Sequence, residues 1–440
     1  MKQALNWALI LTMLVGLVAC TPQVSEELFP ISGEALTASV GTLQSEKPRE
    51  MAPKVDESDL EALVEGNNAF AFDLYQALIR EEDSNLLYSP YSISLALAMT
   101  YAGARGDTER QMRNTLHFDL PQMQLHPAFN SLEQELSRRG EGAMGKDGKK
   151  FRLRIAKAIW GQKDFAFLVD FLNVLSENYG AGLRILDFAS APEKSRSTIN
   201  DWVSNETEGR IKDLIPPDAI TPKTRLLLTN AIYFNAAWRS PFKKESTRDM
   251  SFYLLNGGNV LVPMMRQTEY FKYTEGKSYQ VVELPYDGDE VSMVVLLPKE
   301  GEFAAFEKSL DSRRLKTIIS NLGRREVTLS MPKFEFRSEF DLKNLFSVMG
   351  MSDAFGEQAD FSGMTGKRGV WIDRILHQSF ISTDEDGTEA AAATAVVMAG
   401  SAPGQPKPVV MTIDRPFVFI IRDIQTNTIL FIGRVLNPSA

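Results

Sequence analysis

The chain has very few of the residues that most often build metal and covalent sites. Its 440 residues include one cysteine and three histidines. His117, His126 and His377 lie far apart in the sequence and do not have the spacing of metal ligands. The single cysteine, Cys20, cannot form a disulfide within the chain. We therefore expect no metal and no cofactor.

The sequence motifs of common enzymes are also missing. There is no P-loop, no Gly-x-Ser-x-Gly and no His-Glu-x-x-His. Residues 140–145 match the dinucleotide fingerprint by letters, but they follow a polar helix end instead of a strand. We interpret them as a loop and expect the chain not to be an enzyme. The formal net charge of −9 disfavours nucleic acid as a partner.

The N-terminus has the pattern of an export signal. Lys2 precedes an apolar stretch from Ala8 to Ala19, which is too short for a comfortable membrane span. It ends in Leu17-Val18-Ala19-Cys20, which resembles the lipobox of bacterial lipoproteins. Residues 1–19 are thus predicted to be a lipoprotein signal peptide and Cys20 the lipidated residue, with an uncleaved anchor or a chance cysteine as the alternatives. The mature protein would be exported and lipid-anchored to a membrane of the bacterial cell envelope.

The next segment differs from the rest of the chain. Residues 20–58 lack periodicity and contain four prolines, so we predict a disordered tether. Residues 59–440 show no internal linker or repeat and are predicted to be one domain.

Within this domain, helices are expected before strands. Apolar spacing predicts a helix from Leu60 to Ile79, and Ser89-Pro90 predicts the start of a buried helix that reaches Tyr101. A further helix is predicted over residues 198–215. Strands are predicted over 152–160, 226–234 and several short stretches between 252 and 297. This order indicates an α+β protein.

One segment near the C-terminus has an unusual alternation of small residues. Read as a strand, residues 385–397 place Thr388, Ala390, Ala392, Thr394 and Val396 on one face. Such a strand could enter an existing sheet without burying a charge. A short helix or a solvated linker is the alternative, because alanine is the best helix former.

The same segment resembles the hinge of a serpin reactive loop of the inhibitory type. Four other segments resemble serpin segments in the same order, namely residues 85–94, 229–242, 414–421 and 429–438. The resemblance covers residues 59–440. It implies the serpin fold, with mixed β-sheets, about nine helices and an exposed reactive loop near the C-terminus.

The resemblance also implies an activity. An inhibitory serpin is a suicide substrate of serine proteases, whose partner is the target protease in a covalent acyl complex. The cut loop inserts into the main sheet and distorts the protease. We expect a monomer of this kind that inhibits elastase-, subtilisin- or chymotrypsin-like enzymes. The alternative is a non-inhibitory serpin that acts as a binding protein.

The scissile bond is placed by family spacing. Counting Glu385 as the seventeenth residue before the cut puts the bond between Ser401 and Ala402. The loop is longer than in typical serpins, so Met398 and Ala399 are alternatives. The small apolar neighbourhood suits the proteases named above.

Two further groups of residues follow from the resemblance. The hinge comprises Glu385, Gly387, Thr388, Ala390, Ala392 and Thr394. A gate in the main sheet comprises a polar cluster beneath its centre (Ser89, Ser92, Asn230, His377) and two residues at its top (Trp238, Lys333). A Lys333–Glu385 ion pair would anchor the hinge. Thr388 is expected to lie in the exposed loop and to be the first side chain to turn inward on insertion.

A local basic cluster remains open between two interpretations. Arg138, Arg139, Lys146, Lys149, Lys150, Arg152 and Arg154 lie close together in sequence. They could bind a polyanion or form a solvated charged loop.

Overall fold

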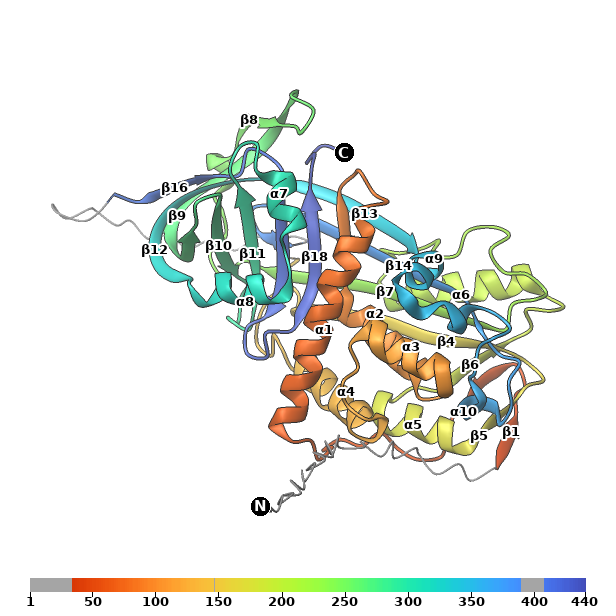
Figure 1. Cartoon of the computed structure of the whole chain (residues 1–440). Helices are drawn as coiled ribbons and strands as arrows, with labels where there is room; N and C mark the ends of the chain where they lie inside the picture. The colour runs from red at the N-terminus through yellow and green to blue at the C-terminus, as the bar shows by residue number, and fades with distance from the viewer. Residues whose placement is uncertain (1–33, 146, 389–406) are drawn as a thin grey trace, which may run out of the picture.

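The computed structural model describes residues 34–145, 147–388 and 407–440. These ranges contain ten α-helices and eighteen strands, arranged in mixed sheets (Figure 1). The predicted α+β class is confirmed.

The larger sheet has nine strands in the order β16-β12-β9-β10-β11-β17-β18-β3, with β8 paired to β9. Its strands are β3 (Leu86–Tyr88), β8 (Arg248–Tyr253), β9 (Asn259–Glu275), β10 (Tyr279–Pro285), β11 (Val291–Pro298), β12 (Gly323–Pro332), β16 (Val409–Thr412), β17 (Phe417–Asp423) and β18 (Ile429–Val435). Every residue of β11, β17 and β18 is buried, so these three strands form the centre of the core.

The second sheet has seven strands in the order β13-β14-β15-β7-β4-β6-β2. Its strands are β2 (Gly41–Leu43), β4 (Arg152–Gln162), β6 (Leu183–Leu186), β7 (Leu226–Ala237), β13 (Phe334–Asp341), β14 (Ile372–Thr383) and β15 (Gly387–Thr388). At its centre β14 and β7 pair in parallel from Ile372 to Ser379, and beyond that point they separate to admit β15. We call the junction between β14 and β7 the seam.

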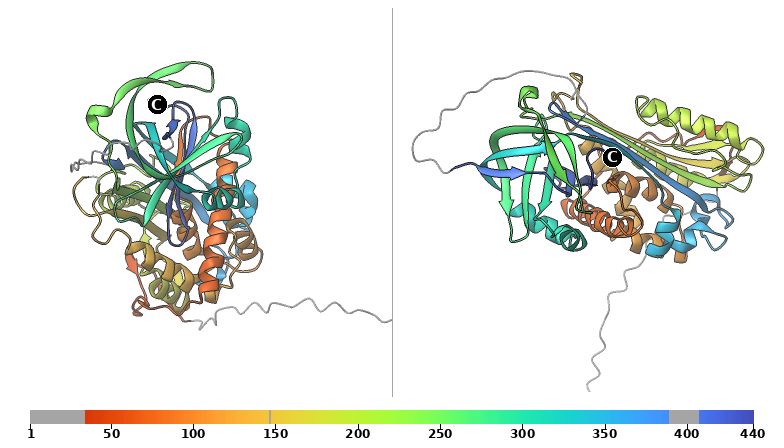
Figure 2. Two further views of the ribbon diagram at one scale, coloured as in Figure 1. Left: turned by 90° about the vertical axis from the view of Figure 1, so that its left-hand side faces the viewer. Right: turned by 90° about the horizontal axis from the view of Figure 1, so that it is seen from above.

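Ten α-helices pack around these sheets in the described residues (Figure 1). They are α1 (Glu57–Leu78), α2 (Pro90–Tyr101), α3 (Gly106–Leu116), α4 (Gln122–Ser137), α5 (Val169–Tyr179), α6 (Pro192–Glu206), α7 (Phe303–Lys308), α8 (Ser312–Ser320), α9 (Lys343–Phe346) and α10 (Ser362–Thr365). Seen from above, α6 lies on one face of the seven-stranded sheet while α1 and α2 lie on the other (Figure 2). All twelve residues of α2 are buried, and the Ser89 hydroxyl caps its N-terminus by accepting from Ser92 N, as the sequence predicts.

Residues 34–58 do not form the predicted tether. β1 (Ala35–Thr37) pairs with β5 (Ala166–Leu168), and β2 adds to the edge of the seven-stranded sheet by pairing with β6. The Arg49 guanidinium then donates to the side chains of Asn130 (2.8 Å) and Glu133 (2.9 Å) on α4. Edge pairing and ion pairs hold this segment in place, and neither requires hydrophobic periodicity. The lack of periodicity therefore led to a wrong prediction of disorder for residues 34–58. Residues 20–33, with Cys20, lie outside the described part.

The helix predicted over residues 198–215 is also wrong at both ends. α6 begins at Pro192 and ends at Glu206, because Glu208 and Gly209 have φ of +52° and +77° and turn the chain away. In the described part of the chain, no helix combines the length and apolarity needed to cross a membrane.

Candidate functional site: the seam and the hinge

The first residues of the predicted loop already occupy the seam. β15 runs antiparallel to both neighbours, with Gly387 opposite Ala237 and Thr388 between Ala236 and Thr383. A strand that continued from Thr388 would therefore extend an arrangement that the sheet has begun.

Gly387 is required for this entry by its geometry. Its φ is +151°, and a Cβ there would lie 2.3 Å from the carbonyl oxygen of Ala236. A larger residue would both strain the backbone and collide with β7. The Asp386-Gly387 pair is thus the point where the chain turns into the sheet.

Thr388 is buried, whereas the sequence analysis expected it in the exposed loop. The residue is 2 % exposed, and its hydroxyl lies 2.8 Å from the hydroxyl of Tyr286. It faces inward as predicted, but it does so before any cleavage. The expectation that Thr388 lies in the exposed loop is wrong, because the backbone of β7 and the hydroxyl of Tyr286 satisfy it inside the sheet.

Glu385 is anchored by the predicted ion pair. Its carboxylate lies 2.7 Å from Lys333 Nζ and accepts a second hydrogen bond of 2.7 Å from the Thr247 hydroxyl. Burial opposes ionisation of Glu385, but these two hydrogen bonds outweigh it and hold the pKa of the carboxyl below its ordinary value. The hinge therefore begins from a charged, fully paired residue.

Trp238 holds the other residues of the turn. Its ring stacks on Tyr286 with centroids 4.6 Å apart, and its Nε1 donates to the carbonyl of Asp384 (3.0 Å). The backbone N–H of Trp238 donates to the carbonyl of Asp386 (3.0 Å), and Lys244 pairs with the Asp386 carboxylate (2.9 Å). The three residues before Gly387 are thus each fixed by a separate contact.

Below the hinge, the polar cluster bridges the two strands of the seam. His377 on β14 and Asn230 on β7 are register partners, and His377 Nδ1 lies 2.7 Å from Asn230 Oδ1. The Ser92 hydroxyl lies 2.7 Å from the same oxygen, and Asn230 Nδ2 donates to Ser92 O (2.9 Å). The start of α2 therefore supports both strands from beneath, as the resemblance implies.

The hydrogen bonds around His377 assign its protonation state. The backbone N–H of Ser89 donates to Nε2 (3.2 Å), so Nε2 carries no proton and Nδ1 donates to Asn230. Burial lowers the pKa of His377 to about 3. A second proton would lie on Nε2 and point at the Ser89 N–H, which would bury a charge and break this hydrogen bond. The seam is therefore built around a neutral imidazole.

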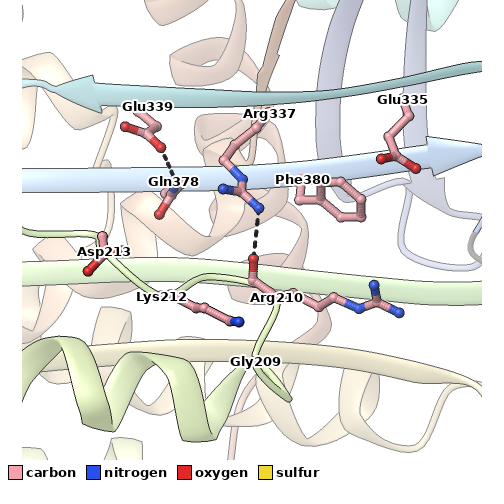
Figure 3. A pocket seen from close by; sticks show the side chains of 9 residues that line it. All are labelled: Gly209, Arg210, Lys212, Asp213, Glu335, Arg337, Glu339, Gln378 and Phe380. Atoms are coloured by element: carbon pink, nitrogen blue, oxygen red, sulfur yellow. Dashed lines mark hydrogen bonds between the residues drawn. The ribbon is translucent and has the colours of Figure 1, made fainter.

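The chain segment that follows α6, around residues 209–213, lies against the seven-stranded sheet. Arg337 on β13 reaches across β14 and donates to the carbonyl of Arg210 (3.0 Å), beside a polar pocket of about 390 Å³ (Figure 3). Gln378 on β14 points into the same pocket and donates to Glu339. A strand that enlarged the seam would have to pass this segment.

The six gate residues predicted from the sequence all lie at the seam or beside the hinge. Several other residues that hold the hinge were not predicted. Thr247, Tyr286, Lys244 and Asp386 lie within these contacts, yet nothing in their local pattern distinguishes them from surface residues. The predicted Ala390, Ala392, Thr394, Met398, Ala399, Ser401 and Ala402 lie outside the described residues.

Three arginines of the basic cluster are paired with acids, and Lys146 lies outside the described residues. Arg139 contacts Asp423 (2.6 Å), Arg152 contacts Asp147 (2.6 Å), and Arg154 contacts Glu208 (3.2 Å). The charges of these three arginines are compensated within the protein, which favours the interpretation of the cluster as a solvated charged loop.

Known proteins share this architecture. The family model for Serpin (serine protease inhibitor) matches residues 65–438. An uncharacterized serpin-like protein of Thermococcus kodakarensis is 40% identical over 377 residues, covering 86% of each chain. The human leukocyte elastase inhibitor is 38% identical over 390 residues, covering 86% of this chain and all of the relative. The thermophilic serpin tengpin in its native state superimposes with a TM-score of 0.77 at 29% identity, covering 90% and 97% of the two chains.

A central sheet whose strands β14 and β7 separate to admit β15, together with the family match, defines the class of protein. The chain belongs to the serpin family, whose members include protease inhibitors.

Proposed function

We propose that the protein is a suicide-substrate inhibitor of serine proteases. The observation that carries the proposal is β15, which sits between two parallel strands and runs antiparallel to both. This is the arrangement that a longer inserted strand would have. The similarity to a leukocyte elastase inhibitor supports an elastase-like target.

The chemistry would come from the protease. Its serine oxygen attacks a carbonyl carbon in the loop, the C–N bond of that peptide breaks, and the new amino terminus leaves with the serine's proton. The freed hinge then lengthens β15 before water can hydrolyse the ester. The inhibitor supplies a substrate and the free energy of strand addition, and it needs no catalytic residue.

The proposed reactive bond is Ser401–Ala402, with Met398 and Ala399 as alternatives. The residues around it are small or apolar, and Lys407, the only basic residue of the loop, precedes Pro408. We therefore propose elastase-, subtilisin- or chymotrypsin-like targets and not trypsin-like ones.

Incubation with a panel of these proteases tests the proposal. At least one should give an adduct that survives denaturing electrophoresis, and trypsin should give none. Mass spectrometry should show that the C-terminal peptide produced by the cut begins at Ala402. Clean cleavage by every enzyme, without an adduct, would instead favour the alternative of a non-inhibitory serpin that acts as a binding protein.

We further propose that the protein is an exported, lipid-anchored monomer in a bacterial cell envelope. The lipobox-like motif at Leu17–Cys20 and the lone cysteine support this location.

A further inference from the structure

A buried oxygen atom on β14 points into the polar pocket without a hydrogen-bond partner among the described residues. Gln378 is 1 % exposed, and its Nε2 donates to the Glu339 carboxylate on β13. Its Oε1 accepts no hydrogen bond and faces the pocket (Figure 3). The amide cannot be turned round, because Oε1 would then face an ionised carboxylate that only accepts. Leaving such an acceptor unpaired costs about 1–3 kcal/mol, so the oxygen is available to a donor from outside the chain.

The floor of this pocket carries its polar groups in rows across two strands. β13 and β14 pair with Glu339 opposite Gln378 and with Arg337 opposite Phe380. Residues two apart on a strand are separated by about 7 Å. A row of acceptors therefore lies about 7 Å from a guanidinium, and Glu335 lies one row beyond it.

The opposite wall repeats this order of charge. It comes from residues 209–213, where Lys212 and Asp213 are exposed, line the pocket and form no ion pair within the described residues. Figure 3 shows Asp213 at the end that holds Gln378, and Lys212 closer to Arg337. The pocket thus has an end that accepts protons in hydrogen bonds and an end that donates them.

The two walls belong to opposite sides of the seam. The floor is formed by β13 and β14, whereas residues 209–213 continue towards β7. Ile211 and Leu214 pack in a core cluster with Trp160 of β4 and Leu227 of β7, and β14 contributes only Leu376 to that cluster. A molecule in the pocket would therefore contact both sides of the seam.

We propose that this pocket binds a small zwitterion whose ammonium and carboxylate groups lie about 7 Å apart, as in an extended dipeptide. The ammonium donates to Gln378 Oε1 and to the carboxylates of Glu339 and Asp213. The carboxylate accepts from Arg337 and Lys212. The pocket volume of about 390 Å³ is that of a small-molecule site.

Titration calorimetry with glycylglycine tests the site. Wild type should bind it, and Gln378→Met and Lys212→Ala should each bind it at least about tenfold more weakly, because each loses a hydrogen bond to a charged group. N-acetylglycylglycine and glycylglycinamide each lack one of the two charges, so wild type should bind both at least about tenfold more weakly as well.

Two variants keep the result interpretable. Lys212→Ala changes an exposed side chain that has no ion pair within the described residues, so its effect does not depend on how well Gln378→Met folds. Lys299→Ala removes the same charge from an exposed position that directly follows β11 in the other sheet, and it should bind glycylglycine like wild type. No binding by wild type, or equal affinity of wild type, Gln378→Met and Lys212→Ala, would overturn the site. Equal affinity for the blocked dipeptides would overturn the zwitterion as its ligand.

A ligand that contacts both sides should also hold the seam closed. Amide hydrogen exchange of β14 from Ile372 to Ser379 should slow when glycylglycine is bound, and unchanged exchange there would overturn this effect. Only the next step rests on the proposed function: glycylglycine should raise the ratio of inhibitor consumed per protease inactivated, because insertion separates β14 from β7. An adduct formed at an unchanged ratio would overturn that step and leave the inhibitor proposal intact. No adduct with wild type would remove the inhibitor proposal, whereas calorimetry would still decide the binding site.

Discussion

The neutral state of His377 makes the seam sensitive to acid. Its pKa is about 3 in the folded protein, against about 6.5 in an unfolded chain. Below pH 6.5 the unfolded chain binds a proton that the native protein does not bind, so unfolding becomes more favourable as the pH falls towards 3. The loss is about 1.4 kcal/mol per pH unit.

His377→Gln should remove this contribution, because glutamine can accept from Ser89 and donate to Asn230 without titrating. Between pH 7 and pH 5 the variant should lose about 2 kcal/mol less of its unfolding free energy than wild type. His126, whose pKa burial also lowers to about 3, and His117, whose pKa is raised by the hydrogen bond that it donates to the Asp73 carboxylate, act equally in both proteins. Glu385 loses its stabilising charge only at more acidic pH, since its pKa is lowered. Urea denaturation midpoints at the two pH values provide the measurement, and an equal pH dependence in both proteins would contradict the prediction.

At the scale of the elements, the decisive prediction concerns the two faces of the hinge. Because Thr388 faces inward, alternation would place Ala390 and Ala392 inward and Ala391 and Ala393 outward in a longer β15. Ala392→Arg would bring an unpaired guanidinium into the sheet, at a cost of several kcal/mol. Insertion should slow, hydrolysis of the acyl-enzyme should win, and the variant should become a plain substrate.

Ala393→Arg is the matched control, with the same residue type one position further along. It should keep inhibition close to wild type. The ratio of inhibitor to inactivated protease is the readout, and equal ratios in the two variants would mean that this segment does not enter the sheet. Thr388 itself is a poor site for the test, because it is already buried.

The elements also show what local sequence can and cannot predict. The capped start of α2 and the buried run of β7 were predictable because their signals are local: an N-cap before proline and a continuous apolar stretch. The edge strand β2 was not, since its place is set by unpaired backbone groups on β6. The hinge contacts of Thr247 and Tyr286 join residues more than 100 positions apart, so only the fold brings them together.

For the whole molecule, the tether hypothesis now applies to a shorter segment. Residues 34–58 are fastened to the domain, which leaves residues 21–33 between Cys20 and the first described residue. With Cys20 lipidated as proposed, a tether of this length would hold the domain close to the membrane surface.

Cys20→Ala should therefore release the protein from the membrane fraction of a bacterial host while inhibition is unchanged. Lost acyl chains explain the expected release, since each buried methylene contributes about 0.8 kcal/mol to membrane binding. Fractionation and immunoblotting of both proteins, with the protease assay on each, measure the two properties. Wild type that is already in the soluble fraction and carries no lipid would contradict the anchor.

The parallel pairing of β14 with β7 has a consequence for how often the molecule can act. Each residue added to β15 would replace slanted hydrogen bonds between parallel strands by two antiparallel ladders, which are the more stable kind. Replacing the parallel pairing by two antiparallel pairings would need no external energy, and its reversal would be unfavourable. Under the proposed function, every molecule would be consumed in one encounter, so the protease activity removed would depend on the number of copies and not on how fast any copy works.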